Sequence, residues 1–125
     1  MPYTIKYNQE KECIEVVVQG ELDLPLLKSM ASDVSKITKQ KGCKFILNDL
    51  RKAIPVEDVF DIYNMPETAA KAGVKQYCKR ALVVGDHASE FYFLETVFVN
   101  QGHLVKMFEN INDAEDWLFG KKEKD

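Results

Sequence analysis

The chain has 125 residues, of which 46% are hydrophobic and 30% are charged, and its formal net charge at pH 7 is -3. This length and composition are typical of one globular domain and exclude a disordered or low-complexity chain. The mild negative charge also excludes the strongly basic surface that a nucleic-acid-binding protein needs.

The N-terminal part of the sequence predicts a hairpin followed by a helix. Residues 3–7 alternate apolar and polar side chains, which is typical of a half-buried edge strand. The polar residues 8–12 then form a loop to a valine-rich strand at 13–19. After a turn, Asp23 is placed to cap a helix, and Gly42 is placed to end that helix in a left-handed conformation.

Two prolines shape the second predicted unit. A short apolar strand at 45–47 is followed by Pro55, which favours the first turn of a helix that runs to about Tyr63. Because proline lacks an amide hydrogen and clashes with the preceding turn, Pro66 is expected to break this helix. A second helical piece then spans residues 66–72.

Two further strand–helix units complete the pattern. The apolar strand at 80–85 precedes the longest predicted helix, at 86–101, and its lack of alternation indicates that both of its faces are covered. A last strand at 105–108 leads to an amphipathic helix at 112–119, which Asn112 is expected to cap.

Strands that alternate with helices predict an α/β fold, because parallel neighbouring strands need long crossover connections. We therefore expect residues 1–120 to form a single domain with an antiparallel N-terminal hairpin. Its sheet should be mixed, mostly parallel and of about five strands, accompanied by four to five helices. Residues 121–125 should form a frayed, charged tail.

The cysteines and the apolar runs indicate the cellular setting. The three cysteines are widely spaced and form no CxxC pair, so we expect reduced thiols; they are Cys13, Cys43 and Cys78. The first residues lack the apolar core of a signal peptide, and no apolar run is long enough to span a bilayer. These features predict a cytoplasmic protein without a membrane span.

The chain has the turn Gly20-Glu-Leu-Asp23 after a valine-rich strand and the strand exit Ile46-Leu-Asn-Asp-Leu50. In these motifs it resembles the STAS domain, a group named for sulfate transporters and antagonists of anti-sigma factors. Its later segments include Arg80–Val84, Phe93–Glu95, Asn100–Gly102, Val105–Phe108 and Ala114–Leu118. These resemble a narrower branch of small bacterial proteins described as SpoIIAA-like, whose fold is also likened to CRAL-TRIO lipid-transfer domains. The resemblance extends from about Tyr3 to Leu118 and implies a fold more directly than an activity.

The resemblance also implies a regulatory site. In anti-sigma-factor antagonists of this group, a partner kinase phosphorylates a serine at the start of the helix that follows the second crossover strand. At this place the chain has Glu57 and Asp58, and no serine or threonine lies between Asn48 and Thr68. The switch is therefore expected to be absent. The two carboxylates either imitate the phosphorylated state or simply oppose the helix dipole, and we favour the second interpretation.

A polar cluster after the strand at 80–85 is the main argument for an enzyme. Asp86, His87, Ser89 and Glu90 supply groups that are used in acid–base and nucleophilic catalysis. The same residues also serve to cap a helix, and no catalytic motif accompanies them, so we favour capping and a non-enzyme. His103, after a predicted helix end, is interpreted as a dipole partner or a solvated loop residue, with neither a metal nor another cofactor expected.

Two features indicate binding. The helix around Tyr92 and Phe93 is too apolar for a single buried stripe, so its surplus either packs in the core, lines a ligand cavity or contacts another subunit. A basic set forms either a solvated face or a site for an anionic head group or acidic partner; it comprises Lys71, Lys75, Lys79 and Arg80, with Arg51 and Lys52 near the strand exits. The candidate partner or ligand surface comprises Asp49, Arg51, Glu57, Asp58, Asp86, His87, Tyr92 and Phe93.

Three functions are compatible with these residues. The leading hypothesis is a non-catalytic STAS-like interaction module that contacts a protein partner through the loops at one end of the sheet. The second is a carrier or sensor of a lipid or another small apolar or anionic ligand, walled by residues 91–99 and 56–65. The third is an enzyme that uses Asp86, His87 and Ser89. The sequence is also compatible with a homodimer whose subunits pair through an uncovered face of the sheet. The candidate pairing residues are Tyr3, Tyr7, Val16 and Val18.

Overall fold

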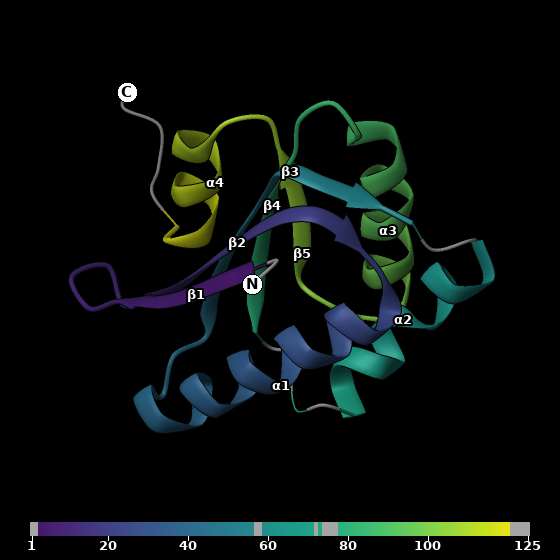
Figure 1. The fold of residues 1–125 in the computed structure, drawn as a ribbon. Helices are drawn as coiled ribbons and strands as arrows, with labels where there is room; N and C mark the ends of the chain where they lie inside the picture. Colours follow the sequence, from purple (N-terminus) through teal and green to yellow (C-terminus); the bar gives the residue numbers. More distant parts are fainter. Residues whose placement is uncertain (1–2, 57–58, 72, 74–77, 121–125) are drawn as a thin grey trace.

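In a computed structural model, which describes residues 3–56, 59–71, 73 and 78–120, five strands form one sheet with helices on both faces (Figure 1). The elements in chain order are β1 (Tyr3–Asn8), β2 (Cys13–Leu22), α1 (Leu24–Lys41), β3 (Phe45–Pro55), α2 (Val59–Lys71), β4 (Lys79–Val83), α3 (Ala88–Asn100), β5 (Val105–Phe108) and α4 (Ile111–Leu118). The prediction of an α/β fold is confirmed.

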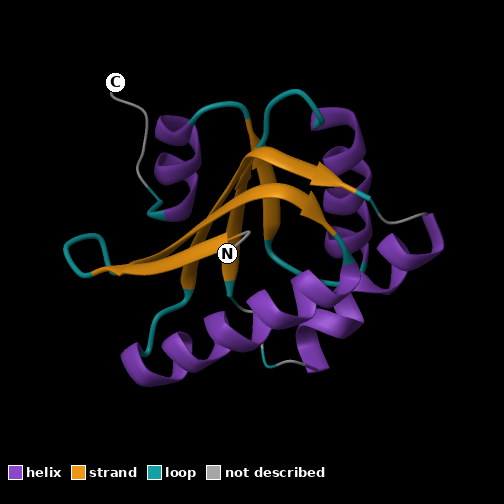
Figure 2. Cartoon of the chain, viewed as in Figure 1, coloured by secondary structure: helices purple, strands orange, loops and turns teal. Residues whose placement is uncertain are grey.

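The strands lie side by side in chain order, β1-β2-β3-β4-β5. β1 and β2 form the predicted antiparallel hairpin, and every other neighbouring pair is parallel. The crossover helices α1, α2 and α3 lie together on one face, whereas α4 lies on the other (Figure 2). Crossovers of one hand that always advance in the same direction place their helices on the same face of a sheet.

The two faces of the sheet have separate hydrophobic cores. The larger core lies beneath α1, α2 and α3, and the smaller one lies beneath α4. Successive residues of β4 alternate between them, because Leu82 belongs to the larger core whereas Ala81 and Val83 belong to the smaller one. This confirms that both faces of the strand predicted at 80–85 are covered.

The strands β2 and β3 are longer than predicted. β2 continues beyond residue 19 to Leu22, and β3 continues beyond residue 47 to Pro55, so Pro55 ends a strand instead of opening a helix. The two strands remain paired over these extra residues, past a register shift between Val17 and Gln19. The turn-like residues Gly20–Leu22 thus pair regularly with Ala53–Pro55, after an irregularity in the ladder.

The helices also differ from the prediction in three places. α2 is continuous through Pro66, because it packs between α1 and α3 and this contact outweighs the loss of one backbone hydrogen bond. α1, with 18 residues, is longer than α3, which starts at Ala88 and ends at Asn100. α4 is capped by Asn110 instead of Asn112, since the Asn110 side chain accepts a hydrogen bond of 2.8 Å from the Asp113 amide.

The outer edge of β5 is partly protected by a side chain. The Glu95 carboxylate, on α3, accepts a 2.9 Å hydrogen bond from the backbone amide of Met107. An unpaired strand edge offers its amides to other chains, and occupying one of them limits such pairing. This contact gives Glu95 a structural role within the predicted Phe93–Glu95 motif.

Two further observations concern the cysteines and the helices of the described part of the chain. Cys13, Cys43 and Cys78 are free thiols and all three are buried. Within that part, no helix has both the length and the apolar character that are needed to cross a membrane.

The N-cap of α1 provides a test of the local structure. Asp23 accepts a 2.9 Å hydrogen bond from the Leu26 amide, and the helix ends at Gly42 with a φ of 64°, both as predicted. Replacing Asp23 by Ala should lower the free energy of unfolding by about 1 kcal/mol, because the first-turn amide loses its acceptor. Urea denaturation measures this change. Asp23→Asn keeps an acceptor oxygen and should stay close to the original protein; equal losses in both variants would contradict the capping role.

Candidate functional site

A polar cleft lies where the carboxyl ends of β4 and β5 meet the middle of β3. Such an edge is the usual ligand-binding position in parallel sheets. The cleft has a volume of about 590 Å³. It is lined by Val17, Val18, Gln19, Asp49, Arg51, Lys52, Val84, Gly85, Asp86 and Glu109. We call these ten residues the edge cleft.

An ion pair fixes the charged centre of the edge cleft. Arg51 donates two hydrogen bonds to the Asp49 carboxylate, from Nε at 2.9 Å and from Nη2 at 2.7 Å. These side-chain hydrogen bonds lower the pKa of Asp49, with a further contribution from the Arg51 amide. A two-point contact of this kind holds both side chains in one geometry. Nearby, an added Cβ at Gly85 would lie only 3.1 Å from the Arg51 carbonyl oxygen, so the β4 exit packs closely on β3.

The cluster after β4 is arranged differently from the prediction. His87, and not Asp86, occupies the N-cap position of α3, and its side chain makes no capping hydrogen bond. Its Nδ1 instead lies 3.2 Å from Glu90 Oε2, and this hydrogen bond lowers the pKa of Glu90. Ser89 Oγ donates to the other Glu90 oxygen at 3.3 Å. Because Ser89 contacts Glu90 rather than His87, the group does not form a serine–histidine nucleophile pair.

The predicted surface residues therefore fall into three groups. Asp49, Arg51 and Asp86 come together in the edge cleft, and His87 follows directly in the chain. Tyr92 and Phe93, on α3, are 61% and 40% exposed but do not line the cleft. Glu57 and Asp58 lie outside the described residues.

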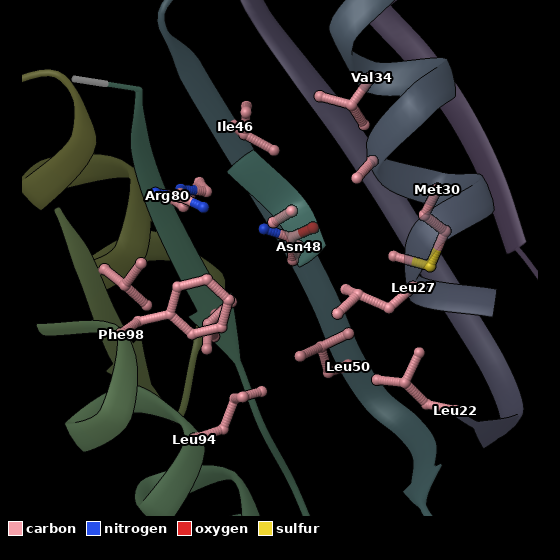
Figure 3. Close-up of a pocket in the computed structure, with 14 residues that line it drawn as sticks. Leu22, Leu27, Met30, Val34, Ile46, Asn48, Leu50, Arg80, Leu94 and Phe98 are labelled. Atoms are coloured by element: carbon pink, nitrogen blue, oxygen red, sulfur yellow. The ribbon is translucent and has the colours of Figure 1, made fainter. Parts of the chain in front are cut away.

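A second, interior cavity lies between the sheet and the helices α1, α2 and α3 (Figure 3). Its volume is about 80 Å³. Of the 14 described residues that line it, 12 are buried, and Leu27 and Asn48 are half-buried. Two of them are polar: Asn48 on β3 and Arg80 on β4 (Figure 3). We call this space the Arg80 cavity.

Arg80 is held from three sides. Its Nε donates to the Cys78 carbonyl at 3.3 Å, its Nη2 lies 2.5 Å from His103 Nδ1, and its guanidinium lies 5.3 Å from the centre of the Phe98 ring. The His103 ring itself meets Phe98 edge-on, with 5.1 Å between centroids. Sequence reasoning missed this cluster, because Arg80 and His103 are far apart in the chain and meet only through the pairing of β4 with the start of β5.

Burial changes the ionisation of both groups in this cluster. It lowers the pKa of Arg80 to about 10, so the guanidinium remains charged at neutral pH. Burial, and secondarily the positive charge of Arg80, lowers the pKa of His103 to about 4. The neutral imidazole can therefore accept a hydrogen bond from Arg80 at Nδ1.

The basic residues of the candidate binding set do not form a single solvated face. Arg80 is only 6% exposed, and His103, which was predicted to be solvated or at a helix dipole, is 5% exposed. Lys79 donates to the Trp117 carbonyl at 2.5 Å and lies over the Trp117 ring, whereas Lys71 pairs with Glu67 on the surface of α2. Lys75 lies outside the described residues. The alternation of β4 turns Arg80 inward, away from its basic neighbours in the sequence.

The proposed dimer face is also occupied by the chain itself. Val16 and Val18 are fully buried beneath α1, and the Tyr3 hydroxyl donates a 2.7 Å hydrogen bond to Asp33 on that helix. Tyr7 packs against the same core. Tyr3, Val16 and Val18 are therefore not free for pairing with a second copy, and Tyr7 is half-buried. No group of three or more potential metal-ligating side chains occurs within the described ranges.

Comparison with known proteins defines the fold. No family model matches the sequence. No curated protein matches it either. Among solved structures, the chain is similar to an uncharacterised protein of the DUF3478 family from Shewanella loihica PV-4, which has a SpoIIAA-like fold. The two are 15% identical, and the match covers 93% of this chain and 91% of the other with a TM-score of 0.59. The chain therefore has a SpoIIAA-like fold.

The lowered pKa of His103 predicts a dependence of stability on pH. Between pH 6.5 and about 4 the unfolded chain binds a proton at His103 that the folded chain does not, so folding loses free energy as the pH falls. Relative to His103→Gln, the original protein should lose about 2 to 3 kcal/mol between pH 7 and pH 4. Urea denaturation across this range measures the difference. Carboxylates titrate in both proteins, so parallel pH curves would contradict the inferred burial of a neutral His103.

Proposed function

We propose that this SpoIIAA-like domain is a non-catalytic interaction module of the STAS type, which contacts a protein partner at the edge cleft. One observation carries the proposal: the parallel strands bring charges of both signs to one solvent-exposed edge, around a fixed Asp49–Arg51 pair. A partner with complementary charges would be recognised and oriented there.

The charges of the edge cleft favour a protein over a small metabolite. Arg51 and Lys52 are positive, whereas Asp49, Asp86 and Glu109 are negative, so no single-sign ligand is matched. The Arg51 side chain remains 47% exposed despite its ion pair and is available to a second carboxylate. Mixed charges at an open surface are typical of the polar parts of protein interfaces.

The sheet beside the edge cleft gives such a partner further area. α4 packs on β3, β4 and β5, and so it covers one side of the sheet face on which it lies. On the same face, Val17 and Glu15 of β2 are only half-buried and Gln19 is exposed. Since Val17 and Gln19 also line the cleft, the exposed sheet and the cleft form one continuous surface.

A lipid carrier is a weaker candidate. The Arg80 cavity does use Leu94 and Phe98 of α3, as the carrier hypothesis expected of this helix. Its volume of about 80 Å³, however, is well below the roughly 300 to 1,000 Å³ of sites for drug-sized ligands. A cavity of this size supports a much smaller ligand.

The absence of a phosphorylation switch stays a prediction. Glu57 and Asp58 lie outside the described residues, so a role as phosphate mimics rests on the sequence alone. Mass spectrometry of the protein isolated from its cells should find no phosphate on residues 48–66, because a serine kinase finds no serine or threonine there and Tyr63 is the one hydroxyl-bearing residue. Phosphate detected in this segment would show that the switch exists in another form.

Charge reversal at the edge cleft tests the proposed interaction. The immobilised protein should capture a specific partner from a native lysate, and Arg51→Glu should reduce this capture at least tenfold, because two like charges would replace the ion pair. Asp86→Lys should have a similar effect. Lys36→Glu, an equal reversal at an exposed position on α1, is the matched control and should keep full capture.

Circular dichroism and thermal unfolding would establish that the variants are folded. Quantitative mass spectrometry of the bound fraction measures the capture. If a partner binds the folded Arg51→Glu and Asp86→Lys variants as well as the original protein, the edge cleft is not its docking site.

A further inference from the structure

The Arg80 cavity holds a buried cation to which no described side chain supplies an opposite charge. The ion pairs of the described side chains are Lys11–Glu115, Asp49–Arg51, Glu67–Lys71 and His87–Glu90, and none includes Arg80. Its contacts are a carbonyl, a neutral imidazole and an aromatic ring. Buried charges in proteins are normally paired, because removing an ion from water is costly. Arg80 is therefore a site that an anion would complete.

The donors of Arg80 are only partly used. A guanidinium has five N–H groups, and the contacts described above engage Nε and Nη2. Asn48, on the neighbouring strand, donates to the Ala81 carbonyl across a long 3.4 Å, and its amide has a second hydrogen. Arg80 and Asn48 both line the cavity, so a ligand there would meet polar donors from two strands (Figure 3).

The remaining walls define the rest of the ligand. Apart from Arg80 and Asn48, the described lining residues are apolar and include Leu82, Leu94 and Phe98. One positive charge matches one negative charge, and a carboxylate fits a guanidinium with two parallel hydrogen bonds. A phosphate dianion would retain an unmatched charge among apolar side chains, which is unfavourable.

The volume limits the ligand to a few heavy atoms. A space of about 80 Å³ is far smaller than a site for a drug-sized molecule and suits a few waters or a small organic acid. Acetate, propionate and butyrate are therefore the acids of suitable size, whereas a long-chain fatty acid is too large.

We infer that the Arg80 cavity binds a short-chain monocarboxylate, with its carboxylate on Arg80 and Asn48 and its alkyl group against Leu82 and Leu94. The site is independent of the proposed interaction function. It lies in the core beneath α1, α2 and α3, whereas the edge cleft includes Val17, Gln19, Asp49 and Arg51 from the face that carries α4.

Methyl-labelled protein tests this inference by NMR at pH 7. Sodium acetate, propionate and butyrate are titrated separately, with sodium chloride added to keep the ionic strength constant. Saturable shifts are expected at the methyl groups of Leu82 and Leu94. Affinity should rise from acetate to the acid that fills the cavity and should fall for longer chains such as octanoate.

Variants separate the roles of the charge and the space. Arg80→Met should weaken binding at least tenfold, because it removes the positive charge that pairs with the carboxylate. Ala69→Val keeps Arg80 but fills part of the cavity, so it should also weaken butyrate binding at least tenfold. Arg51→Met, which removes a surface guanidinium, is the matched control and should bind like the original protein.

Several results would overturn the inference. These are the absence of saturable shifts with all of the acids, unchanged binding by folded Arg80→Met, or equal shifts with chloride or inorganic phosphate. If Arg80→Met does not fold, Ala69→Val and the dependence on chain length decide the question. None of these outcomes affects the proposed docking at the edge cleft, which is measured by capture of a protein.

Discussion

The direction in which the sheet grows constrains the rest of this structure. From β2 to β5 each strand is added in parallel on the same side of its predecessor, so every connection must cross the sheet and return. Crossovers of one hand then place α1, α2 and α3 on a single face. The opposite face receives a helix only after the last strand, when α4 folds back onto β3, β4 and β5. The two faces therefore offer different environments, one thickly covered and one partly open.

The thickly covered face accounts for the position of Arg80. β4 lies between two cores, so alternate residues must enter one or the other. Ala81 and Val83 are small enough to lie under α4, and Arg80 points into the larger core. There it joins β4 to His103, at the start of the β5 segment, and to Phe98 on α3. A residue type that usually lies on the surface thus becomes an interior link between three elements, and its charge defines the chemistry of the cavity beside it.

The partly open face accounts for the edge cleft. β4 and β5 are short, whereas β2 and β3 continue as a two-stranded extension, so the sheet has a step at the carboxyl ends of the shorter strands. Asp49 and Arg51 lie on β3 at this step, and Asp86 follows β4. Asp49 is paired with both neighbouring strands and Arg51 follows it on β3, whereas Asp86 lies in the turn between β4 and α3. A charged centre built on a strand favours a preformed contact surface. The likeness to a solved SpoIIAA-like protein covers 93% of this chain, but at 15% identity it concerns the fold and not the side chains.

The sequence by itself determined the succession of strands and helices along the chain, the N-terminal hairpin and the caps at Asp23 and Gly42. It also determined that both faces of β4 are buried. These features depend on periodicity and on residues close to one another in the chain, which a sequence displays directly. The continuity of α2 through Pro66, the extension of β2 and β3, and the cluster of Arg80 with His103 were decided by tertiary structure alone. In each case a contact between distant segments outweighed a local preference. Helix packing outweighed the tendency of proline to end a helix, and strand pairing outweighed the tendency of the sequence to form a turn. The alternation of side chains along β4 outweighed the preference of a charged residue for solvent.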